Sequence, residues 1–203
     1  MHYFDNINSK IKNKDIFEFK YSFDDENFSF KSHHNLFSKN KVDKGSEVLL
    51  KTVISEFNLE NKNILDIGCG YGVIGVVLAK LYKNSKILMS DITEQAIFIA
   101  EINTANNHVS KNTRVIKSNL FENIDKSKKF DYIITNPPIR AGKNVLNKLF
   151  YNVKEYLNKN GKFIIVIRKN HGLNSVKTYL LNNGMTVDII NKKSGYFVLV
   201  AKN

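Results

Sequence analysis

From Asn63 onward, short apolar runs alternate with segments of helical periodicity, and this alternation restricts the fold more than any other feature of the chain. Repeated strand–helix units predict a mostly parallel sheet with helices on both faces. The runs that we interpret as strands cover residues 64–67, 86–90, 113–117, 132–135, 162–167, 185–190 and 196–201, and helical patterns cover residues 73–82, 93–106, 143–157 and 173–182. Only residues 191–195 join the last two strands, too few for a parallel crossover, so the last strand should be antiparallel. The prediction is an α/β fold with a seven-stranded, Rossmann-like sheet.

The N-terminal part follows a different pattern. Residues 16–31 alternate apolar and polar side chains on either side of a turn at residues 24–27, which predicts a β-hairpin whose aromatic residues pack against the domain. An amphipathic helix is expected to start at Ser46 and Glu47 after a loop. We therefore expect residues 1–45 to form an extension and residues 46–203 to form the main domain.

Composition limits the class of protein. A chain of 203 residues with 42% hydrophobic residues can bury one core, and no apolar run reaches the length of a membrane span. With one cysteine and neither a basic nor an apolar leader segment at the start, we expect a soluble, cytoplasmic protein, by default a monomer. The formal charge of +12 suits a polyanionic partner, but a lysine- and asparagine-rich composition also arises from an AT-rich genome. Charge alone leaves nucleic-acid binding and a solvated surface equally open.

A glycine-rich turn follows the first strand of the main domain. Gly68, Gly70 and Gly72 give the pattern G-x-G-x-G, whereas the dinucleotide fingerprint has a third glycine where this chain has Val73. Asp66 leads into the turn and would repel a pyrophosphate but attract an ammonium group. The turn therefore indicates a ligand that carries an amino acid.

Two further polar residues end neighbouring strands. Asp91 lies about 20 residues after the glycine turn, where a carboxylate can accept both hydroxyls of a ribose. The alternative role of Asp91 is the N-cap of the helix that begins near Thr93. Asn119 follows the third strand and can accept a hydrogen bond from an adenine amino group, although a plain loop asparagine fits nearly as well.

Both prolines of the chain stand in the run Asn136-Pro137-Pro138-Ile139, directly after an apolar strand. Proline fixes its own φ, lacks an amide donor and pushes the preceding residue out of the helical region, so this run leaves the strand as a stiff, extended corner. An asparagine oxygen and a nearby carbonyl held at such a corner can jointly accept the two protons of a planar –NH2 group. The corner thus indicates chemistry on an amino group.

Together these motifs resemble class I S-adenosylmethionine-dependent methyltransferases that act on an exocyclic or amide nitrogen. Residues 37–46, 66–72, 136–143 and 168–172 narrow the resemblance to the ribosomal small-subunit methyltransferase C family, which methylates N2 of a guanine in 16S ribosomal RNA. Longer members of that family carry two methyltransferase-like halves, and this chain resembles the catalytic one. The hairpin is then a candidate for RNA recognition.

The resemblance implies roles for three sets of residues. S-adenosylmethionine would contact Asp66, Gly68, Cys69, Gly70, Tyr71, Asp91, Ile92, Asn119 and Asn136. The catalytic corner would be Asn136, Pro137, Pro138 and Ile139, with the Asn136 oxygen and the Pro137 carbonyl holding the guanine amino group. Ribosomal RNA or the small subunit would contact Phe37, Ser38, Arg140, Lys143, Arg168, Lys169 and His171.

Several points stay open at this level. Ile139 stands where related enzymes often have an aromatic residue that stacks on the target base, and Phe37 or Phe121 is a candidate substitute. No metal is expected, because His33 and His34 lack a carboxylate, cysteine or spaced histidine partner in the sequence. The rival functions are methylation of a protein glutamine amide or of adenine N6, and a non-catalytic ribosome-binding factor.

Overall fold

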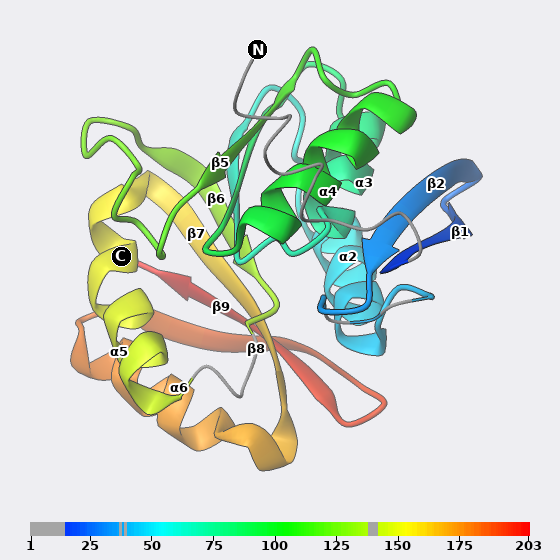
Figure 1. The fold of residues 1–203 in the computed structure, drawn as a ribbon. Coiled ribbons are helices and arrows are strands. Elements are labelled where there is room, and N and C mark those ends of the chain that lie inside the picture. Colours follow the sequence, from blue (N-terminus) through cyan, green and yellow to red (C-terminus); the bar gives the residue numbers. More distant parts are fainter. Residues whose placement is uncertain (1–14, 37, 39, 138–141) are drawn as a thin grey trace.

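The computed structural model describes residues 15–36, 38, 40–137 and 142–203, and within them seven strands form one sheet (Figure 1). Its spatial order is β5-β4-β3-β6-β7-β9-β8, and every neighbouring pair is parallel except the two that β9 makes. The predicted α/β fold is confirmed, and the reversed strand lies between β7 and β8. The strands are β3 Asn63–Ile67, β4 Lys86–Asp91, β5 Thr113–Lys117, β6 Phe130–Thr135, β7 Leu157–Arg168, β8 Thr186–Lys193 and β9 Tyr196–Lys202.

Helices cover both faces of the sheet, because successive side chains of each strand point to opposite sides. One face packs against α2 (Lys44–Glu56), α3 (Val73–Leu81) and α4 (Glu94–Asn106), and the other against α5 (Lys143–Asn152) and α6 (Leu173–Asn182) (Figure 1). Ile64 belongs to the first of these two cores, and its neighbour Leu65 belongs to the second. Among the helices of the described residues, none is long and apolar enough to span a membrane.

Two helix boundaries differ from the prediction by two residues or more. The Asp43 carboxylate accepts hydrogen bonds from the backbone N–H groups of Gly45 and Ser46, so α2 begins at Lys44 and not at Ser46. The helix predicted for residues 143–157 ends at Asn152, where the chain tightens into a 3-10 helix, Val153–Tyr156, before β7. A second 3-10 helix, Lys169–His171, follows β7.

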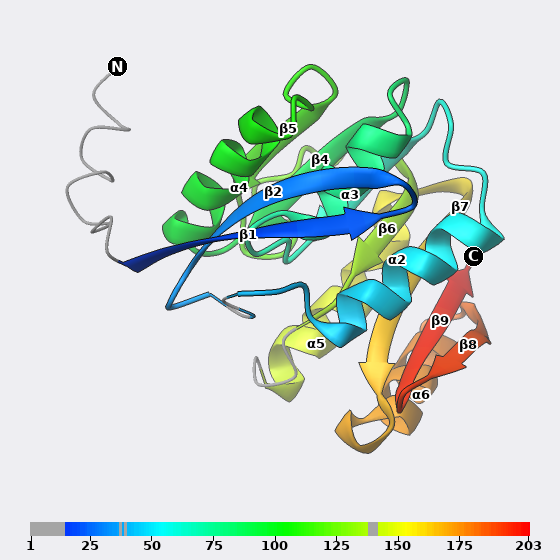
Figure 2. The same cartoon turned by 90° about the vertical axis from the view of Figure 1, so that its right-hand side faces the viewer.

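The predicted hairpin is present as β1 (Ile16–Phe23) and β2 (Glu26–His33), joined by Asp24 and Asp25, which both have positive φ. It lies across α3 and α4 (Figure 2). Phe28 and Phe30 are buried in the same core as these helices, and the Tyr71 ring meets Phe30 edge-on with centroids 5.9 Å apart. The prediction that the hairpin aromatics pack against the domain is confirmed.

Asn103 of α4 and Asn107, the C-cap residue of that helix, hold the hairpin by its backbone. Asn103 accepts from the Lys31 N–H (2.7 Å) and donates to the carbonyls of Lys31 (2.8 Å) and Tyr71 (2.8 Å). Asn107, one helical turn later, accepts from the Ser29 N–H (3.0 Å) and donates to the Ser29 carbonyl (2.8 Å). Residues 29 and 31 present their backbone groups to the same side of β2, so the two side chains take the place of a neighbouring strand.

Replacing Asn103 with alanine is expected to lower the free energy of unfolding by about 2–4 kcal/mol, because Asn103 is fully buried and its loss removes the partners of three backbone groups. Urea unfolding measures this loss, and hydrogen exchange should become faster at Lys31. Asn106→Ala is the matched control, since Asn106 is exposed on the same helix. Equal stability of the two variants would contradict this role of Asn103.

Candidate active site

The order of the strands sets the place of the site. From β3 the chain crosses to β4 on one side, and from β6 it crosses to β7 on the other, so β3 and β6 flank the point where the topology reverses. Ligands of open α/β sheets bind at the carboxyl ends of the strands beside such a point. The Thr135 hydroxyl ties these two ends together by donating to the Ile67 carbonyl at 2.8 Å. The glycine turn follows β3 and Asn136 follows β6, so the fold brings the two main predicted motifs to one crevice.

The backbone of the glycine turn is hydrogen-bonded to the end of β4, and Gly68 and Gly70 have open space beside them. Gly68, Gly70 and Gly72 have φ values of 73°, 57° and 88°, a region that L side chains rarely adopt. The N–H groups of Gly68 and Cys69 both donate to the Ser90 carbonyl, at 2.8 and 2.9 Å. A Cβ built at Gly68 or Gly70 meets no heavy atom of the described residues within 4 Å. The turn therefore forms a cradle that a ligand can approach closely.

Asp66 is buried below the turn, 1% exposed. Its Oδ2 accepts from the Gly75 N–H at 3.0 Å, in the first turn of α3, where the preceding Gly72 has no side chain to cap the helix. Its Oδ1 is also buried and has no hydrogen-bond partner within the described part of the chain. Burial raises the pKa of Asp66 from 3.8 to about 7, against the lowering effect of the Gly75 bond, and Asp91 raises it further. A buried carboxylate with an unpaired oxygen suits a cationic ligand group.

Asp91 connects the glycine turn to the start of α4. Its Oδ2 accepts from the Gly70 N–H at 3.0 Å, and its Oδ1 accepts from the N–H and the hydroxyl of Thr93 at 3.0 and 3.1 Å. The N-cap of α4 is Thr93, whose hydroxyl accepts from the Ala96 N–H, so the alternative role of Asp91 as N-cap is wrong. The next residue, Ile92, is 56% exposed. Asn119 donates through its amide nitrogen to Glu122, at 2.8 Å.

Asn136 is anchored through its amide nitrogen. Nδ2 donates to Asp43 Oδ1 and to Ser46 Oγ, both at 3.0 Å, at the N-terminus of α2. Both amide hydrogens thus have acceptors, one in the N-cap residue and one in the first turn of α2. The amide oxygen lies on the opposite side of the planar group. Pro137 is buried directly after Asn136. Asp43 and Ser46 were missed as site residues, and the available signal was an N-cap aspartate inside a segment that already resembled the family.

Cys69 and Tyr71 are buried. Burial raises the pKa of the Cys69 thiol well above its ordinary value, and Asp66 and Asp91 add to this, so the thiol stays protonated and is no nucleophile. The Tyr71 ring lies against Phe19 and Phe30, with centroids 6.0 and 5.9 Å away, and so packs under the hairpin. The cofactor contacts predicted for these two residues stay predictions.

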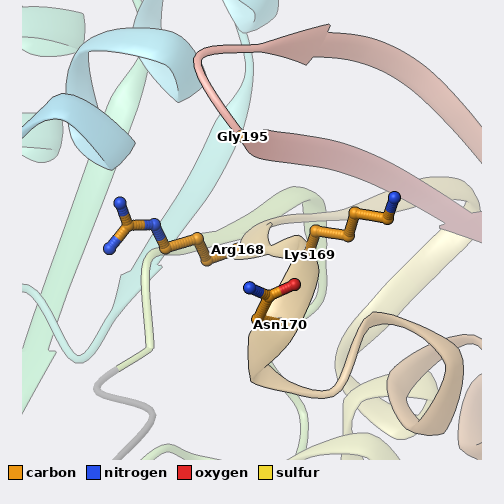
Figure 3. A pocket seen from close by; sticks show the side chains of 4 residues that line it. All are labelled: Arg168, Lys169, Asn170 and Gly195. Carbon is orange, nitrogen blue, oxygen red and sulfur yellow. The ribbon is translucent and has the colours of Figure 1, made fainter.

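Two basic residues lie at the carboxyl end of β7, Arg168 as its last residue and Lys169 directly after it. Arg168 stacks on Tyr196, with its guanidinium carbon 5.5 Å from the ring centroid. A Cβ built at Gly45 would lie 3.1 Å from Tyr196 Cε1 and 3.2 Å from Asn136 Nδ2, so Tyr196 reaches the anchor of Asn136. A pocket of about 440 Å³ opens beside them, and in Figure 3 the side chains of Arg168 and Lys169 extend in opposite directions from its wall; its lining is Arg168, Lys169, Asn170 and Gly195.

Other predicted substrate residues are placed differently. Phe121 is buried and stacks on Tyr156 at 4.4 Å between centroids, so the suggestion that it replaces the aromatic base platform is wrong. Ser38 is described, with φ of 60°, and its hydroxyl donates to the Lys41 carbonyl. Phe37, Pro138, Ile139 and Arg140 lie outside the described residues, as do the side chains of Lys143 and His171.

The two adjacent histidines have a carboxylate neighbour that the sequence did not indicate. Asp15, His33 and His34 bring one possible ligand atom each to within 4.8 Å of one another, because the start of β1 pairs with the end of β2. Nδ1 of His33 already accepts from the Asn35 N–H at 3.2 Å, which leaves the proton of the neutral ring on Nε2. This hydrogen bond opposes metal binding by His33.

Comparisons with known proteins agree with this geometry. The family model described as "Methyltransferase small domain" matches residues 27–200. The chain belongs to this family. It is 37% identical over 201 residues to the uncharacterised protein YbxB of Bacillus subtilis, covering 99% of this chain and 98% of that protein. It is also 30% identical over 148 residues to ribosomal RNA small subunit methyltransferase C of Buchnera aphidicola, covering 71% of this chain but only 44% of that protein.

A solved structure gives the same result for the fold. The T. thermophilus 16S rRNA N2 G1207 methyltransferase, in complex with AdoMet and guanosine, superposes with a TM-score of 0.83 over 93% of this chain and 50% of that one, at 21% identity. The sheet with its reversed last strand is thus the methyltransferase fold. The chain spans less than half of the methyltransferase C sequence from Buchnera and half of the solved enzyme.

The methyl donor of this methyltransferase is S-adenosylmethionine, and the residues of the crevice fit it. Asp66 Oδ1 is a buried acceptor without a partner among the described residues, as the α-ammonium group of the donor requires. The open faces of Gly68 and Gly70 leave room for its amino-acid part. Asp91 offers a carboxylate at the end of β4, the place expected for a ribose.

The affinity for S-adenosylmethionine is expected to fall nearly tenfold for each pH unit below about 7, and to change little above pH 7 until the ammonium group of the donor itself loses its proton. Below pH 7 the buried Asp66 is protonated in the free protein, so binding of the ammonium group must release that proton. Titration calorimetry at pH 5.5–8.5 in buffers of different ionisation enthalpy measures both the affinity and the proton release. Asp66→Asn should remove this dependence, and an unchanged pH profile in that variant would contradict the assignment.

The same shift affects the free protein. The folded pKa of Asp66 lies above its unfolded value, so the folded state binds the proton more tightly. The free energy of unfolding of the ligand-free protein should therefore decrease as the pH rises from about 4 to about 7. This slope is opposite to that of an aspartate held in an ion pair.

Proposed function

We propose that this protein, acting as a cytoplasmic monomer, transfers a methyl group from S-adenosylmethionine to an exocyclic amino nitrogen of ribosomal RNA, with guanine N2 as the acceptor. The observation that carries the proposal is the anchoring of Asn136 Nδ2 by Asp43 and Ser46. It turns the amide so that an oxygen, and no N–H group, is offered to a substrate. An –NH2 group has two hydrogens to donate, and the Pro137 carbonyl is the second acceptor at this corner.

Methyl transfer to an amino group requires mainly that the protein orient that group. The lone pair of a guanine amino group is delocalised into the ring, so the amino group is a poor nucleophile. Two fixed acceptors favour the pyramidal geometry in which the lone pair is localised and directed. S-adenosylmethionine supplies an electrophilic methyl group on a sulfonium. The Asn136 corner then acts by orientation, and the amino proton is lost to solvent as the product forms.

Placement of the positive charge supports RNA as the acceptor. Arg168 lies at the carboxyl edge of the sheet, where its stack on Tyr196 holds the guanidinium beside the Asn136 anchor. A planar guanidinium that is held in this way can pair with a phosphate through two hydrogen bonds. The named relatives that act on ribosomal RNA point to the same class of substrate.

Radiolabelled methyl transfer tests the proposal. Small ribosomal subunits and naked 16S RNA, both from cells that lack this gene, are incubated with the enzyme and labelled S-adenosylmethionine, and the RNA is digested to nucleosides. Label in N2-methylguanosine is the expected result. Label in N6-methyladenosine or in protein glutamine would show that the acceptor is an adenine or a glutamine instead, since both carry a planar –NH2 group. Donor binding without transfer to any fraction would favour a ribosome-binding factor.

A further inference from the structure

We propose that Asp43 and Ser46 are positioning residues for methyl transfer, which lock the Asn136 amide in the orientation that its role as an acceptor requires. This inference rests on the proposed function for the meaning of that orientation. It assigns a role in the reaction to the N-terminus of α2, which lies outside the strand–helix units that carry the glycine turn and Asp91. Asp43 and Ser46 precede Asn136 by 93 and 90 residues in the chain.

The two anchors restrict the amide differently. A carboxylate only accepts hydrogen bonds, whereas a hydroxyl can donate or accept. If the Asn136 amide turned over, its oxygen would face Asp43 Oδ1 at about the present 3.0 Å, and two acceptors would repel each other. Ser46 could adapt by rotating its hydroxyl. Asp43 therefore selects the orientation, and Ser46 holds the second hydrogen.

The anchor itself is rigid. Asp43 Oδ1 accepts from the N–H groups of Gly45 (2.9 Å) and Ser46 (3.1 Å) as the cap of α2, so the helix fixes the carboxylate before Asn136 meets it. Ser46 is buried, 3% exposed. A Cβ at Gly45 would come within 3.0 Å of Asp43 Oδ1 and 3.2 Å of Asn136 Nδ2. The absence of a side chain at Gly45 therefore leaves room for Asp43 and Asn136 to approach each other beside Tyr196.

The charge of Asp43 also acts on the bond to the substrate. A hydrogen bond from an amide N–H to a carboxylate is stronger than one to a neutral oxygen and polarises the amide, which places more negative charge on its oxygen. The Asn136 oxygen thereby becomes a better acceptor for an amino hydrogen. The anchor pair contributes to both the direction and the strength of the acceptor.

Asp43→Asn removes the charge of the anchor, which leaves a weaker acceptor for the Asn136 amide, and Ser46→Ala removes the second acceptor. Neither variant removes the cap of α2, because asparagine also caps helices well. Each single variant is expected to lower kcat about tenfold, and the double variant about a hundredfold, with KM and Kd for S-adenosylmethionine unchanged. Asp125→Asn and Ser55→Ala are matched controls: Asp125 caps a turn at Ser127, and Ser55 bonds to the backbone of α2, both away from the corner. Variants with the kcat of wild type would overturn the proposal.

A second readout needs no substrate. In protein labelled with 15N-asparagine, the Asn136 side-chain NH2 signals are identified by their loss in Asn136→Ala. Both hydrogens are expected to exchange slowly with water in the wild type, and exchange should become faster in Asp43→Asn and Ser46→Ala but not in the two controls. Fast exchange in the wild type would overturn the anchoring. If no acceptor is methylated while both hydrogens are protected, the proposed function fails and the anchoring stands.

Discussion

Asn136→Ala is expected to reduce the rate of methyl transfer at least about a hundredfold, as large as the loss of one oriented hydrogen-bonding group in other active sites. The variant removes the oxygen that the Asp43 and Ser46 anchor presents to the substrate. Affinity for S-adenosylmethionine should stay nearly unchanged, because Asp66 and Asp91 supply the proposed cofactor contacts from other strands. Single-turnover transfer measures the rate, and titration calorimetry measures the affinity.

Asn136→Asp separates the role of the Asn136 oxygen as an acceptor from the role of its NH2 group in the anchor. It keeps an oxygen at the corner but replaces the donating NH2 by a second carboxylate 3.0 Å from Asp43, and the two charges should push the side chain away. We expect it to be as inactive as the alanine variant. Asn152→Ala, which removes an amide that donates to the Lys148 carbonyl in an exposed hydrogen bond, is the control for a lost asparagine. A large loss of cofactor affinity in Asn136→Ala would show that Asn136 serves cofactor binding instead.

The sequence predicted the parts of the site that are short-range. The turn at Gly68, Gly70 and Gly72 and the carboxylate of Asp91 follow from local spacing, since each sits at a strand end that the apolar runs already define. The anchor of Asn136 could not be predicted in this way, because it joins residues 93 and 90 positions apart. The unpaired oxygen of Asp66 could not be predicted from the sequence either, because burial depends on how the core packs.

The same division holds for the fold. Periodicity predicted every strand of the sheet and the antiparallel direction of β9, but the place of β9 between β7 and β8 depends on which edges pair in space. The hairpin and the packing of its aromatic residues against the domain were predicted from residues 16–31, but the hydrogen bonds that attach its backbone to the domain were not. In the sequence Asn103 is an ordinary residue of the predicted helix and Asn107 follows that helix directly, and only the approach of β2 makes them partners of its backbone.

Asp91→Ala is expected to weaken S-adenosylmethionine binding about a hundredfold. The proposed bonds from the two ribose hydroxyls to a carboxylate are charge-assisted, and the loss of about 3 kcal/mol corresponds to this factor. The substitution also leaves the N–H groups of Gly70 and Thr93 without their acceptor, so the glycine turn loses its link to α4. Asp188→Ala controls for the loss of a charge, because Asp188 is an exposed aspartate in β8 that forms an ion pair with Lys202. Calorimetry gives the affinities.

Ligand fragments separate the two carboxylates of the crevice. Methylthioadenosine contains the ribose and adenine of the donor but lacks its amino-acid part. If Asp91 holds the ribose, Asp91→Ala should weaken methylthioadenosine and S-adenosylmethionine by the same factor. If Asp66 Oδ1 receives the ammonium group, Asp66→Asn should weaken S-adenosylmethionine alone, and only at pH values where Asp66 is ionised. A variant of Asp91 that spared methylthioadenosine would place the ribose elsewhere, and the bonds to Gly70 and Thr93 would then be the whole role of this carboxylate.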